Sequence, residues 1–102
     1  MHLIHLLLPL HDNQNRSFAP QQFQTVRKEL TEEFGGVTAF VRSPAVGLWK
    51  EGDEGISRDE VVMFEILADQ LNDDWWRQYR KKLEAAFRQD EILIWSVEVT
   101  KL

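Results

Sequence analysis

The histidines are the first candidates for acid–base chemistry in this sequence, because an imidazole titrates close to neutral pH. His5 lies in a short apolar segment, and Glu65 and Glu98 lie in later apolar segments that could pair with it across a sheet. A carboxylate beside an imidazole orients the ring as a base. His5 is therefore the candidate catalytic residue. The alternative is an imidazole that is only hydrogen-bonded inside a subunit interface.

The histidines do not predict a metal site. His2 and His5 have a spacing seen in metal ligands, but these positions of one strand point to opposite faces of a sheet and cannot share an ion. His11 and Asp12, in a polar loop, are a poorer second possibility. The chain has no cysteine, which excludes thiolate ligands, disulfides and a cysteine nucleophile. We expect neither a metal nor a cofactor.

Two further residues could contact a ligand. The planar guanidinium of Arg42 matches a carboxylate or a phosphate, and a cross-sheet pair with Glu65 or Glu98 is the alternative. Trp49 lies among the five glycines of the chain, all of which fall within residues 35–55. A tryptophan on such a segment could close over a pocket as a lid, or insert into a partner subunit.

The spacing of apolar residues predicts the elements that must position these side chains. Strands are expected at residues 2–8, 37–42, 59–68 and 91–100. One helix is expected to begin near Pro20, whose missing N–H has no partner in a first turn anyway, and to end at Gly35. A second helix begins after Asn72, which can cap it. Their buried stripes are Phe23, Val26, Leu30 and Phe34, then Trp76, Tyr79, Leu83, Ala86 and Phe87.

The order of these elements is β-α-β-β-α-β. With right-handed crossovers it predicts an α+β, ferredoxin-like split βαβ fold, as one domain over residues 1–102. The expected sheet is antiparallel and four-stranded, in the order 4-1-3-2, with both helices on one face. The opposite face of the sheet is left open.

Alternation along the strands predicts which residues occupy that open face. We place the wholly apolar sets under the helices, among them Leu93, Trp95, Val97 and Val99 on the last strand. A one-residue shift would exchange the two faces of a strand. The open face is then expected to hold His5, Thr38, Phe40, Arg42, Met63, Glu65, Ser96 and Glu98, with Leu3, Leu7, Val61 and Ile94.

An open sheet face with this many apolar residues is typical of an interface. We therefore expect a homodimer or a higher homo-oligomer that forms through the open face. The enclosed face could also bind a small molecule. The ligand-binding residues would be His5, Phe40, Arg42, Met63, Glu65 and Glu98, with Trp49 near the mouth.

Over nearly its whole length the chain resembles a protomer of the dimeric α/β barrel superfamily, which pairs two ferredoxin-like sheets through their open faces. Residues 34–49 (FGGVTAFVRSPAVGLW) and 83–94 (LEAAFRQDEILI) look like motifs of small bacterial families of unknown function. In those families a GG-x-T strand leads into a G-x-W loop, and an F-x-Q turn leads into the last strand. The resemblance implies a homodimer, and it allows an enzyme of the monooxygenase or isomerase kind found in similar barrels.

The charge balance bears on the partners. Twelve Lys and Arg against 17 Asp and Glu give a net charge of −5, which argues against nucleic acid and anionic membranes. No stretch approaches the roughly 20 apolar residues of a membrane helix, and no signal peptide is evident. Arg77, Lys81 and Arg88 form a basic helix face that could dock an acidic partner, and a solvated face is the alternative.

These observations lead to two hypotheses about function. In the first, a small, soluble, cytoplasmic protein forms a homodimer through its open face and binds a small molecule there. In the second, the same residues are contacts of a non-catalytic assembly module that has no ligand. Whether the chain is an enzyme stays open at this point.

Overall fold

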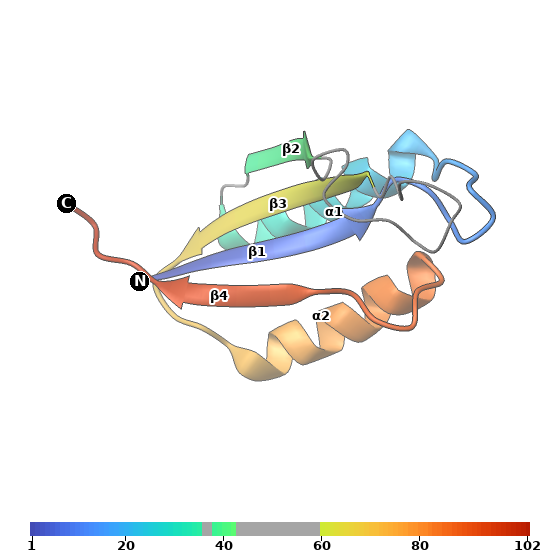
Figure 1. The fold of residues 1–102 in the computed structure, drawn as a ribbon. Helices are drawn as coiled ribbons and strands as arrows, with labels where there is room; N and C mark the ends of the chain where they lie inside the picture. Colours follow the sequence, from blue (N-terminus) through green and yellow to red (C-terminus); the bar gives the residue numbers. More distant parts are fainter. Residues whose placement is uncertain (36–37, 43–59) are drawn as a thin grey trace, which may run out of the picture.

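The sheet holds strands that are far apart in the sequence side by side. The structure, a computed structural model, describes residues 1–35, 38–42 and 60–102. Its elements are β1 (His2–Pro9), α1 (Pro20–Phe34), β2 (Thr38–Arg42), β3 (Val61–Ala68), α2 (Asp73–Ala86) and β4 (Ile94–Glu98). The four strands form one antiparallel sheet in the order β2-β3-β1-β4, which is the expected order (Figure 1). This α+β arrangement is compatible with the ferredoxin-like fold.

Helix α1 begins and ends where the sequence predicts. Pro20 stands in its first turn, and Gly35 follows its last residue with a left-handed φ of 80°. The backbone N–H of Gly35 donates to the Thr31 carbonyl at 2.7 Å, which satisfies a carbonyl that the last turn leaves open. Val26 and Leu30 are buried, and Phe23 and Phe34 pack against the core. The predicted stripe of this helix is confirmed.

Helix α2 is capped by Asn72, as predicted. The side chain of Asn72 accepts a hydrogen bond from the backbone N–H of Trp75 at 3.1 Å, and two acidic residues follow in the first turn, where the helix dipole favours negative charge. Trp76, Tyr79, Leu83 and Phe87 are buried, whereas Ala86 is exposed. The prediction for Ala86 is wrong because the stripe passes from Leu83 to Phe87.

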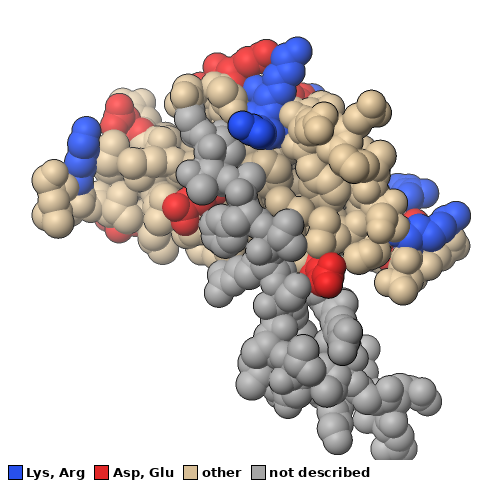
Figure 2. Space-filling view, turned by 90° about the horizontal axis from the view of Figure 1, so that it is seen from above, with Lys and Arg blue, Asp and Glu red and all other residues tan. Residues whose placement is uncertain are grey.

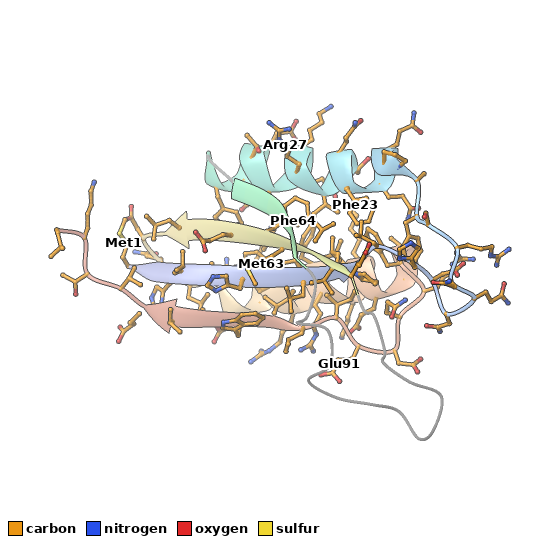
Figure 3. The ribbon with its side chains drawn as sticks, turned by 45° about the horizontal axis from the view of Figure 1, so that its top comes forward. Met1, Phe23, Arg27, Met63, Phe64 and Glu91 are labelled. Carbon is orange, nitrogen blue, oxygen red and sulfur yellow. The ribbon has the colours of Figure 1, made fainter. Side chains whose placement is uncertain are left out.

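The core lies between the helices and one face of the sheet. Ile4, Leu6 and Leu8 of β1 alternate with half-buried residues, and Phe64 of β3 is 1% exposed. Full burial of such side chains contributes about 1.5–3 kcal/mol each. Both helices thus cover the same face, and the opposite face can be followed in Figure 3, where Met63 and Phe64 are labelled. The core cluster is Ile4, Leu6, Leu8, Phe18, Val26, Leu30, Val62, Phe64, Ile66, Ala68, Trp76, Tyr79, Leu83, Phe87 and Ile92.

Strand β4 faces the opposite way from the prediction. Directly opposed residues of antiparallel strands share a face, and His5 of β1 opposes Trp95, while Leu3 opposes Val97. Trp95 and Val97 therefore lie on the open face, and Ile94 packs against the core. The prediction assumed that the wholly apolar set of the strand is the one under the helices. It is wrong because the open face itself is apolar enough to receive that set.

The boundaries of the strands differ slightly from expectation. Strand β4 covers Ile94–Glu98 rather than residues 91–100, and Ile92 is already buried before the strand begins. Trp49 and the connection of residues 43–58 lie outside the described residues, as does residue 37. Phe40 and Arg42 are described as positions on β2, without their side chains.

Candidate functional site

The expected pairing of His5 with Glu65 is present in the structure. The two residues oppose each other on the central strands β1 and β3, and His5 Nε2 lies 3.0 Å from Glu65 Oε2. The His5 side chain is 15% exposed and that of Glu65 36%. The contact is thus largely screened from solvent, where a charge-assisted hydrogen bond is stronger than at an open surface.

Trp95 completes the contacts of His5 from the other side. It opposes His5 on β4, and the two rings stack with centroids 5.0 Å apart and planes inclined by 22°. The imidazole is therefore held between a carboxylate on one neighbouring strand and an indole on the other. We call His5, Glu65 and Trp95 the His5 cluster. Trp95 was not predicted as a site residue, since its strand was assigned to the opposite face.

One nitrogen of the imidazole has no partner. His5 Nδ1 is buried and forms no hydrogen bond within the described part of the chain. When the neutral ring donates from Nε2 to Glu65, Nδ1 carries the lone pair and can only accept. A buried polar atom without a partner costs about 1–3 kcal/mol. The cluster can therefore accept a hydrogen bond from a donor placed at Nδ1.

Apolar side chains surround the His5 cluster on the open face. Leu3 opposes both Leu67 and Val97, and Leu7 opposes Met63. Leu67 is 48% exposed and Val97 47% exposed, although both are large apolar residues. Met63 lies on this face and is only 4% exposed. The polar pair thus stands in an apolar surface, as is usual in small-molecule sites.

Not all of the other predicted site residues lie near the His5 cluster. Glu98 opposes His2, so it lies on the helix side of β4, and its predicted place beside His5 is wrong. Ser96 and Ile94 share that side for the same reason. Thr38 opposes Glu65, and Phe40 opposes Met63; these β2 positions accordingly belong to the open face, as predicted. Arg42 opposes Val61 at the far end of the strand.

Among the described residues, Asp12 and Tyr79 have shifted pKa values, and both lie away from the His5 cluster. Burial raises the pKa of Tyr79, and the nearby Glu29 carboxylate, 3.3 Å from the phenol oxygen, adds to the rise. The backbone N–H of Arg16 donates to Asp12 and lowers the pKa of that carboxyl. The first contact links α2 to α1, and the second lies within the loop that follows β1.

Two of the three residues of the predicted basic face, Arg77 and Arg88, lie near acids. Arg77 lies 3.3 Å from Asp74, and Arg88 lies 3.4 Å from Asp12. Figure 2, which views the molecule from the side opposite α2, shows Lys and Arg side chains beside Asp and Glu there as well. Exposed pairs of this kind contribute little to stability, and they break up the positive charge that a polyanion would need.

Within residues 1–35, 38–42 and 60–102, no three His, Asp or Glu side chains come together in a group that could hold a metal ion. No helix in those ranges has the length and apolar character that crossing a membrane requires.

The fold and the His5 cluster define an α+β protein with an apolar, partly polar-lined sheet face. No protein-family model matches the sequence, and no curated protein matches it. The resemblance to small bacterial families thus stays a prediction. The chain is similar to a solved structure of a phage SAM lyase in complex with S-methyl-5'-thioadenosine, with a TM-score of 0.64 and 12% identity. The match covers 95% of this chain and 80% of that one. At this identity the likeness shows a shared fold alone.

Proposed function

We propose that this chain forms a homodimer through the open face of its sheet and binds a small molecule there, at the His5 cluster. The observation that carries the proposal is the partly buried His5–Glu65 pair, with His5 stacked on Trp95, in an apolar surface that the helices do not cover. A second copy that covers this surface would enclose the pair and exclude water from it.

The support for a homodimer is the exposure of apolar residues on one face. Leu67 and Val97 flank the cluster with about half of their surface exposed, and Leu93 is 54% exposed just before β4. Covering the exposed half of a leucine or valine is worth about 1 kcal/mol. Contiguous apolar surface of this kind on a small protein is typical of an interface. A second copy of the chain is the partner that resemblance to the dimeric α/β barrels implies.

The support for a ligand is the polarity of the cluster. An interface between copies needs no buried imidazole, and His5 Nδ1 is left without a donor. A flat heteroaromatic ring with an N–H group would satisfy Nδ1 and pack on Trp95 and the leucines. The similar phage enzyme was solved with S-methyl-5'-thioadenosine, a ligand with such a ring and an apolar thioether. We therefore propose nucleosides of that kind as the class of ligand.

The second hypothesis, an assembly module without a ligand, also has an observation in its favour. His5 already has two of its contacts inside one chain, with Glu65 and with Trp95. Such a pair could simply fix the register of β1, β3 and β4 in a dimer. The two functions differ in whether a ligand binds while the dimer stays intact.

Calorimetric titration of the purified protein with S-methyl-5'-thioadenosine tests the ligand. We expect saturable binding to wild type and a loss of at least about tenfold in affinity for Trp95→Leu, because about 1.4 kcal/mol of stacking is removed. Gln14→Ala, in an exposed loop, is the matched control and should bind as wild type does. Light scattering on the same samples reports the dimer. An intact dimer with no heat of binding would favour the assembly module, and a monomer would overturn both hypotheses.

A further inference from the structure

A second candidate site lies on the opposite side of the sheet from the His5 cluster. Helix α2 runs beside the edge strand β4 (Figure 1), and a cleft of about 310 Å³ separates them. We call it the α2–β4 cleft. Trp76, Arg77 and Arg80 of α2 line one side, and Ile94, Trp95 and Ser96 of the edge strand β4 line the other.

One residue that lines the cleft carries a polar group without a partner. Trp76 is 6% exposed, and its indole Nε1 is buried without a hydrogen bond in the part of the chain that the structure describes. An indole N–H can only donate, and leaving it unpaired costs about 1–3 kcal/mol. A ligand that enters the cleft gains most when it presents a hydrogen-bond acceptor to this nitrogen.

The charges of the cleft favour a monoanion. Arg77 and Arg80 supply two guanidinium groups and Asp73 one carboxylate, so one positive charge is in excess. Both arginines are exposed, and their intrahelical acids lie at 3.3 and 3.9 Å, in loose surface pairs. Such pairs contribute little, and the guanidinium groups can turn to a carboxylate with little loss.

The remaining walls are apolar. Ile4, which is 1% exposed, forms the floor with Ile94, and Leu71 stands at the rim with 36% of its surface exposed. Besides the Trp76 indole, the Ser96 hydroxyl is an uncharged side-chain group of the cleft that can form a hydrogen bond. The net charge of +1 on Arg77, Arg80 and Asp73 matches a monoanion better than a phosphate monoester, which carries close to two negative charges at neutral pH.

We propose that the α2–β4 cleft binds a small monocarboxylic acid with an apolar body. A carboxylate oxygen accepts the hydrogen bond of Trp76 Nε1, Arg77 and Arg80 balance the charge, and the apolar body packs on Ile4 and Ile94. The arrangement has the composition of a ligand site: mostly apolar walls and a few polar groups that fix orientation. The proposal does not rest on the proposed function of the open face, although Trp95 lines this cleft and also stacks on His5.

Titration of the ¹⁵N-labelled protein with hexanoate tests the site by NMR. The four tryptophans of the chain give separate indole N–H signals, and Trp76→Phe identifies the one from Trp76. We expect hexanoate to shift this signal saturably and more than the others, because a charged acceptor strengthens the hydrogen bond. Hexanamide, which has the same body without the charge, should bind about tenfold more weakly.

The variant Arg77→Gln/Arg80→Gln changes only exposed side chains and should fold normally. We expect it to weaken hexanoate binding by about tenfold and to leave hexanamide binding unchanged. Arg27→Gln, an arginine on the outer side of α1 (Figure 3), is the matched control. The proposal is overturned if the Trp76 signal does not respond to hexanoate at millimolar concentration, or if the amide and the double variant bind as the acid and wild type do. Neither outcome bears on nucleoside binding at the open face.

Discussion

Two buried side-chain nitrogens of the described residues, His5 Nδ1 and Trp76 Nε1, have no hydrogen-bond partner. They lie on opposite faces of the sheet. The unpaired nitrogen of the neutral imidazole can only accept a hydrogen bond, whereas the indole N–H can only donate one. Buried polar groups in folded proteins are nearly always paired. His5 belongs to the proposed site of the open face and Trp76 lines the α2–β4 cleft, so each proposed ligand would supply a partner for one of these atoms.

Tyr79 is a buried polar residue that does have a partner, and it predicts a loss of stability at high pH. Burial and the contact with Glu29 raise the pKa of its phenol above the ordinary value of 10.0. The unfolded chain therefore releases this proton at a lower pH than the folded chain does. The stabilisation is fully present below pH 10 and is lost as the pH rises toward the folded-state pKa, at up to about 1.4 kcal/mol per pH unit.

Urea unfolding of wild type and Tyr79→Phe between pH 8 and pH 11 measures this effect. We expect the difference between their free energies of unfolding to narrow above pH 10. Because Tyr79 is the one tyrosine of the chain, the ultraviolet absorbance of tyrosinate reports its ionisation directly. Ionisation of the folded protein at the ordinary pKa of a free phenol would contradict the assignment.

Among the elements, those with a local backbone signal can be predicted from the sequence alone. Pro20, Gly35 and Asn72 mark helix ends by their own stereochemistry, and the structure places the ends there. The contact of His5 with Glu65 also follows from strand order and alternation.

The orientation of β4 cannot be predicted in this way, because apolar residues occupy both of its faces. Ile92 is buried in the core while Leu93, the next residue, is 54% exposed. Alternation gives two sets but not which set faces the helices. Only pairing with β1, which sets Trp95 opposite His5, decides it. For this reason Trp95 was missed and Glu98 was wrongly included in the site.

The cap of α2 gives a prediction at the scale of elements. Asn72→Ala removes the acceptor for the Trp75 N–H, and we expect the free energy of unfolding to fall by about 1 kcal/mol. Asn13→Ala, at an exposed loop position, is the control and should change it by less than about 0.5 kcal/mol. Urea unfolding followed by circular dichroism measures both. Equal losses in the two variants would mean that the cap does not stabilise the helix.

At the scale of the whole molecule, the two helices cover one face of the sheet, and large apolar residues on the opposite face stay exposed to solvent. Leu67, Leu93 and Val97 are each about half exposed, while Arg77 and Arg80 on the outside of α2 lie near acids of their own helix. The surface is thus polar where the helices cover the sheet and apolar where they do not. That asymmetry is what a protomer needs when its sheet packs on a second copy.

Val97→Asp tests this arrangement of the whole molecule. A carboxylate at a position that is 47% exposed in one chain is tolerated in a monomer, but in a sheet-to-sheet dimer it is buried without a partner and costs several kcal/mol. We expect light scattering to show a dimer for wild type at micromolar concentration and a monomer for the variant. Leu71→Asp, at a residue 36% exposed on the helix side, is the matched control and should stay dimeric. Dissociation of both variants alike, or of neither, would locate the interface elsewhere and remove the enclosure on which the proposed nucleoside site depends.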